Sequence, residues 1–243
     1  MQEENVQVIA KKPISENPLL IEGFPGIGLV GNIASQYIVQ ELGMTYLGTM
    51  DSRFFPPLTV MLQGLVTMPV RIYEKPEMSV IVITSDVPIH PMASFDVAKE
   101  LVSWAESINI RELVSIAGIE IFGEERRVYG AVTSEDLLNR FRGKLEIFEV
   151  GSISGITGSM MNECLLKKIP AVCLLGEVHT KGPDPRAAVA TIEKLNELYG
   201  LGVNTTKLIE QTEQIELQMH QLSEQMNTTT AEEPHKKEFP MYG

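Results

Sequence analysis

The chain is short of cysteine, and this excludes two classes of protein. Only Cys164 and Cys173 occur among 243 residues, and they do not form a close pair. A disulfide framework or a cysteine-based zinc site needs more sulfur atoms at closer spacing. We therefore expect both cysteines to be small core residues in a reducing compartment.

Long apolar runs are also missing. No segment approaches the 18 or so continuous apolar residues of a membrane-spanning helix. The chain starts Met1-Gln2-Glu3-Glu4-Asn5, without the basic and apolar regions of a signal peptide. These features predict no membrane partner and a cytoplasmic location.

Basic side chains are scarce as well. The net charge is −12 at pH 7, from 20 Lys and Arg against 32 Asp and Glu. The nearest approaches to a basic cluster are Arg126-Arg127 and Lys167-Lys168, which we interpret as solvated surface residues. Because binding to a phosphate backbone needs clustered positive charge, the composition disfavours a nucleic-acid partner.

What the sequence does contain is a regular alternation of apolar strands and amphipathic helices. The alternation predicts an α/β domain over residues 1–203, with three layers and a mostly parallel sheet covered by helices on both faces. The segment 53–73 has Pro56, Pro57 and Pro69, which predict short edge strands and turns. The expected strands are 19–24, 45–50, 80–83, 113–117, 145–150 and 171–175, and the expected helices are 29–41, 94–107, one ending near 141, 155–168 and 184–200.

Three helices carry terminal signals. Ser94 is expected to cap the helix that runs to Ser107, and Thr133 with Asp136 forms a possible capping box. Asp184-Pro185 is typical of a helix start and Gly200 of a helix end.

The character of the chain changes after residue 203. The residues Leu208, Thr212, Ile215, Met219, Leu222 and Met226 are spaced four, three, four, three and four apart. This heptad seam predicts a helix over 204–226, which either self-associates or lies on its own domain. Residues 227–243 are rich in Thr, Glu, Lys and Pro, so we expect a flexible tail.

Two glycine-rich loops are candidate ligand sites. Gly26, Gly28 and Gly31 in the loop 23–31 fit the dinucleotide-binding pattern, and Asp51 follows at the distance of a ribose-binding acid. However, Pro25 removes a donor where a phosphate would need one, so we favour close packing of helix on strand. The loop 151–159 could hold phosphate through hydroxyl and N–H groups, or form a capped helix entry, which we prefer.

Few catalytic groups surround these loops. Glu177, His179 and Asp184 follow the last strand, and His90 lies in a similar loop. A metal or acid–base site from them is possible, but their spacing matches no metal motif, and we interpret them as solvated loop residues. The sequence predicts no metal, no cofactor and no enzymatic activity.

The first glycine-rich loop, Gly23-Phe24-Pro25-Gly26-Ile27-Gly28-Leu29-Val30-Gly31, resembles the hallmark of the proteasome assembly chaperone family in its archaeal form. Further segments agree along residues 9–226, in the same order: 55–57, 71–73, 150–155, 174–177 and 183–188.

This resemblance implies a nucleoside-phosphorylase-like fold, a homo-oligomer such as a tetramer or pentamer, and no demonstrated catalysis. It also implies a C-terminal hydrophobic-Tyr-X tail that enters pockets between neighbouring α-subunits of the proteasome core particle. In this chain the tail residues are Met241, Tyr242 and Gly243. We therefore expect an assembly chaperone or activator of the core particle; the alternative is an enzyme acting on a nucleotide or nucleoside at the two glycine-rich loops.

Overall fold

The computed structural model describes residues 6–121, 126–180 and 182–212. The chain separates into two compact units, 1–205 and 206–243, and each is described by itself. In the second unit, residues 206–212 are helical. The heptad positions from Ile215 onward and the tail 227–243 lie outside the described residues.

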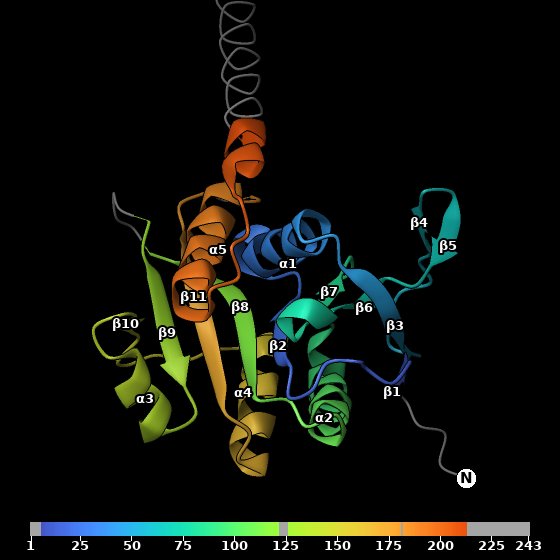
Figure 1. Ribbon diagram of the computed structural model, residues 1–243, viewed down its shortest axis with the longest axis horizontal. Helices are drawn as coiled ribbons and strands as arrows, with labels where there is room; N and C mark the ends of the chain where they lie inside the picture. The colour runs from blue at the N-terminus through green and yellow to red at the C-terminus, as the bar shows by residue number, and fades with distance from the viewer. Residues whose placement is uncertain (1–5, 122–125, 181, 213–243) are drawn as a thin grey trace, which may run out of the picture. The chain divides into compact units, whose positions relative to one another are not determined.

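The first unit is built on a sheet of nine strands in the order β1-β3-β6-β7-β2-β8-β11-β9-β10 (Figure 1). The strands are β1 (Val6–Ala10), β2 (Leu19–Gly23), β3 (Thr45–Ser52), β6 (Val70–Lys75), β7 (Val80–Ser85), β8 (Glu112–Glu120), β9 (Val128–Val132), β10 (Glu146–Ile147) and β11 (Ala171–Val178).

The sheet is mixed: its centre is parallel, as predicted, and antiparallel pairs lie on both sides of that centre. The four central strands β7, β2, β8 and β11 are parallel to one another. Antiparallel pairs border them on both sides, with β6 against β7 and β9 against β11. The central strands are the continuous apolar runs that the sequence shows plainly, because strands buried on both faces have no polar alternation.

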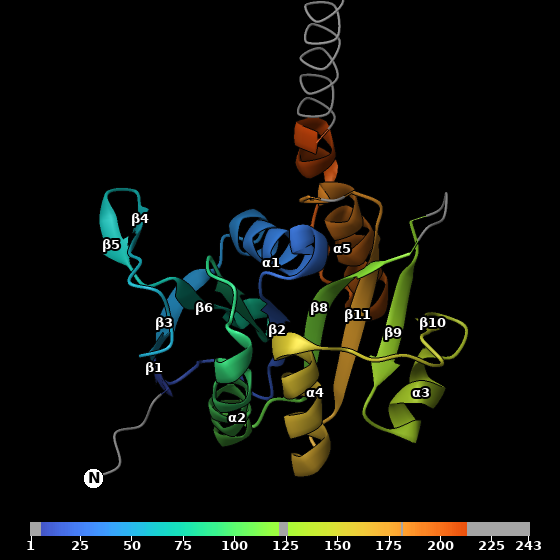
Figure 2. The same ribbon diagram turned by 180° about the vertical axis from the view of Figure 1, so that it is seen from behind.

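Helices cover both faces of the sheet, which confirms the predicted three layers. On one face α1 (Val30–Glu41) packs beside α5 (Pro185–Tyr199), and on the other α2 (Pro91–Ser107) packs beside α4 (Gly155–Lys167) (Figures 1 and 2). The short helix α3 (Glu135–Phe141) lies next to β9.

The helix ends confirm one prediction and correct two. Helix α5 begins after Asp184, whose side chain accepts from the Ala187 N–H, and ends at Gly200 as expected. Helix α2 begins three residues earlier than predicted, because His90 Nδ1 rather than Ser94 caps it. Helix α3 is capped by Ser134 and not by Thr133.

The segment 53–73 is only partly as predicted. It contains a separate hairpin of β4 (Val60–Leu62) and β5 (Leu65–Thr67), on which Met61 and Val66 are each 75% exposed. Strand β6, however, is an inner strand between β3 and β7 and is almost wholly buried. Pro69 precedes it, and so removes no hydrogen bond from the sheet.

The entry to α1 approaches the sheet very closely. A Cβ at Gly31 would lie 2.3 Å from the Ile116 carbonyl oxygen of β8. Only glycine therefore lets the first turn of α1 rest on this strand.

We predict that Gly31→Ala lowers the free energy of unfolding by about 1–3 kcal/mol or more, because backbone must move to admit the methyl group. Chemical denaturation measures the change. Gly182→Ala is the control, since a Cβ at Gly182 meets nothing within 4 Å. Equal stability of the two variants would contradict this account of the packing.

Candidate functional site

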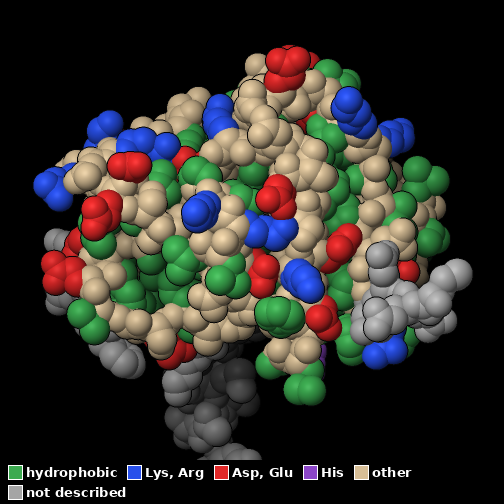
Figure 3. Space-filling view, turned by 90° about the horizontal axis from the view of Figure 1, so that it is seen from below, with side chains coloured by type: hydrophobic (Ala, Val, Ile, Leu, Met, Phe, Trp, Pro, Cys, Tyr) green, Lys and Arg blue, Asp and Glu red, His purple; other side chains and the backbone are tan. Residues whose placement is uncertain are grey.

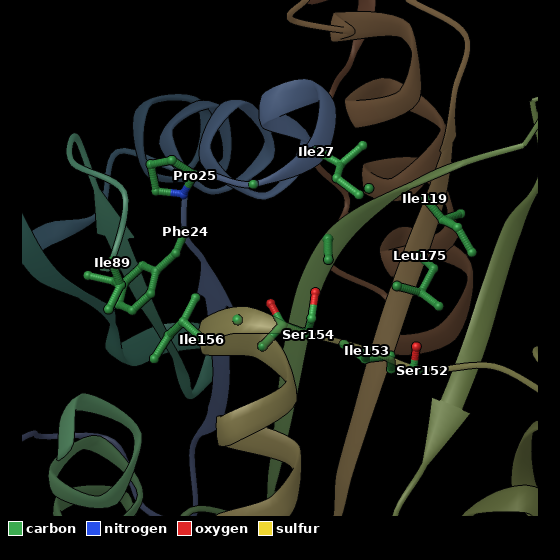
Figure 4. Close-up of a pocket in the computed structure, with 15 residues that line it drawn as sticks. Phe24, Pro25, Ile27, Ile89, Ile119, Ser152, Ile153, Ser154, Ile156 and Leu175 are labelled. Atoms are coloured by element: carbon green, nitrogen blue, oxygen red, sulfur yellow. The ribbon is translucent and has the colours of Figure 1, made fainter. Parts of the chain in front are cut away.

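The two glycine-rich loops meet at the carboxyl end of the parallel strands. The loop 23–31 follows β2, and the loop 151–159 leads into α4. Between them lies a cavity of about 260 Å³, with walls that include Phe24, Ile27, Ile89, Ile119, Ile153 and Leu175 (Figure 4). No Lys, Arg, Asp, Glu or His of the described chain lines it.

The first loop serves close packing of helix on strand, which is the interpretation that we preferred. Gly28 has φ +61°, and a Cβ there would lie 2.6 Å from Val178. The Gly28 carbonyl accepts a hydrogen bond of 2.8 Å from the Asp184 N–H, which ties this loop to the start of α5.

Asp51 is not brought to the first loop. It lies on β3, which β6 and β7 separate from β2. At roughly 4.8 Å per strand the separation is about 14 Å. In a dinucleotide-binding fold the strand after the first helix pairs with the first strand, so the arrangement of this chain does not form that site.

The second loop differs from the capped helix entry that we preferred. Ser154 occupies the capping position of α4, but its side chain makes no capping hydrogen bond. The first turn of α4 contains no acidic residue. Figure 4 shows Ser154 at the start of α4, facing the space beneath Pro25 and Ile27.

Glu177 and His179 lie close together, but Glu177 is not the solvated loop residue that we predicted. It lies within β11, one residue before the end of the strand, and is completely buried; it accepts from the Tyr129 hydroxyl at 2.9 Å and the Arg127 N–H at 3.0 Å. The Arg127 guanidinium is 3.2 Å away and His179 Nε2 is 3.8 Å away. Burial raises the pKa of Glu177, but these hydrogen bonds and charges outweigh it and leave the pKa below its usual value.

Asp184 is likewise buried and fully engaged. It accepts from the N–H groups of His179 and Ala187 and pairs with Arg126 at 2.6 Å. Burial raises the pKa of Asp184, and the bond to Arg126 and the two backbone bonds lower it further than that, so it stays ionised. Arg126 and Arg127 therefore pair with the buried acids Asp184 and Glu177, and are not merely the solvated surface residues that we predicted.

These groups do not assemble a metal site. Within the described residues, no three His, Cys, Asp or Glu side chains are placed to hold a metal ion. His90 is engaged in capping α2. Both cysteines are buried as predicted, and burial raises the pKa of Cys164 to about 12, so its thiol is a poor nucleophile.

Glu22 on β2 is one of the buried acids that we did not predict from the sequence. Its carboxylate accepts from the Phe24 N–H at 2.9 Å and from the Ser115 hydroxyl, and no cation pairs with it in the described structure. Burial raises its pKa to about 7, while the Ser115 and Phe24 hydrogen bonds oppose that shift. The signal was available, because Glu22 is the single charged residue in the apolar stretch 19–24.

The surface offers no basic face in the view from below. Figure 3 shows Lys and Arg interspersed with Asp and Glu there, without a continuous positive area. Among the described helices, none has the length and apolar character needed to cross a bilayer.

Comparison with known proteins places these features in a wider group. The model of the PAC2 family matches residues 20–223. An uncharacterized protein of Methanocaldococcus jannaschii is 33% identical over 240 residues, which cover 98% of this chain and 99% of that protein.

Two solved structures of Pyrococcus furiosus proteins share the fold. PbaA, an archaeal homolog of proteasome-assembly chaperone, has a TM-score of 0.87 at 34% identity, over 93% of this chain and 95% of that one. PbaB, an archaeal proteasome activator, has a TM-score of 0.79 at 26% identity, over 90% of this chain and 99% of that one.

The buried position of Glu22 predicts a pH dependence of stability. Between its ordinary pKa of 4.5 and about 7, the folded chain keeps a proton that the unfolded chain releases. Raising the pH through this window therefore lowers the free energy of unfolding. We expect the native chain to lose about 2–3 kcal/mol more than Glu22→Gln between pH 5 and pH 8.

Denaturant titration at the two pH values measures this difference. Glu120→Gln, at the exposed end of β8, is the control and should follow the native chain. If Glu22→Gln showed the same pH dependence of the free energy of unfolding as the native chain, Glu22 would titrate as an ordinary carboxyl.

Proposed function

This chain belongs to the PAC2 family, and from that premise we propose that it is a chaperone or activator of the proteasome core particle in the cytoplasm. The resemblance to archaeal proteasome assembly chaperones is confirmed at the level of the family. The similarity to PbaA carries the proposal, because it extends over nearly the whole α/β unit rather than over one motif.

We assign different roles to the two units. The α/β unit is a scaffold, since its buried acids Glu177 and Asp184 are fully engaged by Arg126, Arg127 and backbone N–H groups. The segment from residue 204 presents the tail. Relatives with names that describe a chaperone homolog and an activator support a binding role over a catalytic one.

In our proposal, the residues that dock are Met241, Tyr242 and Gly243. Met241 fills an apolar pocket between neighbouring α-subunits, Tyr242 stacks and donates a hydrogen bond, and the Gly243 carboxylate pairs with a lysine. A peptide of this kind binds weakly by itself, because ordering it costs free energy.

Self-association compensates for that weakness. A homo-oligomer, which we propose to be a tetramer or pentamer, offers several tails at once and raises their effective concentration. The heptad seam over 204–226 supports association through the helix, whereas packing of that helix on its own domain would leave assembly to the α/β unit.

The enzyme alternative receives less support. Its two loops surround a cavity without charged side chains in the described chain, whereas strong phosphate recognition favours Arg or Lys. A nucleoside-phosphorylase-like fold remains part of our proposal, and the parallel centre β7-β2-β8-β11 supports it.

The sharpest prediction concerns the free carboxylate of the tail. One residue added after Gly243 keeps every side chain but moves the charge, which in a charge-assisted contact is worth roughly 1.5–3 kcal/mol. We expect binding to the core particle to fall about tenfold or more per tail, as measured by surface plasmon resonance. Tyr242→Ala should do comparable damage, because it removes aromatic burial and a hydroxyl contact.

Changes at Glu232 or Lys236 in the tail are the controls and should leave binding unchanged. Native affinity in the extended chain would refute the carboxylate contact. If Tyr242→Ala also bound with native affinity, the α/β unit rather than the tail would have to bind the core particle.

A second prediction concerns mass. Light scattering at micromolar concentration should show a closed homo-oligomer well above the 27.0 kDa of one chain. A clean monomer would remove the avidity on which the tail mechanism depends.

A further inference from the structure

We propose that the cavity between the two glycine-rich loops binds a small carboxylate with an apolar body, held by the start of α4. This site goes beyond the proposed proteasome function and does not depend on it. Three features of the described chain lead to it: its place in the sheet, the open start of α4, and the hydroxyl of Thr157.

The cavity lies where the order of the sheet reverses. From β2 the chain builds one side through β3, β6 and β7, and later the other side through β8 and β11. The cavity is lined from both β2's loop and β8, by Phe24 to Ile27 and by Ala117 to Ile119. Ligands of open α/β sheets bind at this point, outside the carboxyl ends of the strands.

The start of α4 supplies hydrogen-bond donors with no internal acceptor. The first N–H groups of any helix lack partners within the helix and carry partial positive charge. Ser154 does not cap them, and the first turn has no acidic side chain to do so. Ser154, Gly155, Ile156 and Thr157 all line the cavity, so an anion there would meet these donors.

Thr157 is the independent observation. Its side chain is only 7% exposed and lines the cavity, yet its hydroxyl has no hydrogen-bond partner among the described residues. The hydroxyl is not among the fully buried polar atoms that lack a partner, where the described chain has Ser15 Oγ, so it is accessible from the cavity that Thr157 lines. A ligand oxygen in the cavity would accept this hydrogen bond.

The lining fixes the chemical class. A phosphate, with nearly two charges, favours Arg or Lys, and none lines the cavity. A single carboxylate matches the roughly half charge of a helix start. The remaining wall is apolar, with Phe24, Ile89 and Ile156 on one side and Ile119, Ile153 and Leu175 on the other (Figure 4). A volume of about 260 Å³ is at the small end for ligand sites, which excludes a whole nucleotide.

Calorimetry on the full chain tests this site with four probes. We expect 3-methylbutanoate and benzoate to bind saturably with Kd of about 1 mM or tighter. Inorganic phosphate and the neutral 3-methylbutanamide should bind at least about tenfold more weakly. Equal binding of the amide, tighter binding of phosphate, or no saturable binding of either carboxylate would overturn the assignment.

Two variants locate the binding. Thr157→Val keeps the shape and removes the hydroxyl, so the carboxylates should bind about tenfold more weakly while the Tm stays within a few degrees. Ala117→Leu should abolish binding by filling the cavity from β8. Thr191→Val is the control and should bind the carboxylates like the native chain, since the Thr191 hydroxyl donates to the Ala187 carbonyl within α5. Native affinity in both Thr157→Val and Ala117→Leu would place any binding elsewhere and overturn the proposal.

Discussion

The close contact of the loop 23–31 with β8 and β11 is the constraint on which the rest of the α/β unit depends. Gly31 lets α1 rest on the Ile116 carbonyl, and Gly28 turns beside Val178 at a positive φ. The Gly28 carbonyl then accepts from the Asp184 N–H, so the first helix and the last helix of the unit begin from one shared contact. Asp184 in turn caps α5 and pairs with Arg126.

This constraint explains why the unit acts as a scaffold in our account. Asp184 pairs with Arg126 and Glu177 pairs with Arg127, and the two thiols are buried in the core. The cavity near the loops, at the start of α4, is small and largely apolar. In our proposal the chain after residue 204 docks to a large partner, and a ligand in the cavity would act on the scaffold itself.

Much of the fold could be predicted from the sequence, because buried parallel strands and helix ends leave local signals. The runs 80–83 and 171–175 and the pair Asp184-Pro185 are examples, and the structure confirms all three. Strand β9 was missed because it pairs antiparallel with β11, a partner more than 30 residues away that no local pattern announces. The burial of Glu177 and Asp184 was missed for the same reason, since their guanidinium partners lie about 50 residues earlier. At the candidate cavity the two loops were identified, but the uncapped start of α4 and the lone hydroxyl of Thr157 are matters of geometry.

The central claim is that the tail, rather than the surface of the α/β unit, holds this chain on the proteasome. Electron cryo-microscopy of the full chain mixed with the core particle of its own organism tests this most directly. Our account predicts density for residues 241–243 in pockets between neighbouring α-subunits, with the α/β units outside the ring. A complex in which the α/β units contact the ring and those pockets are empty would contradict it.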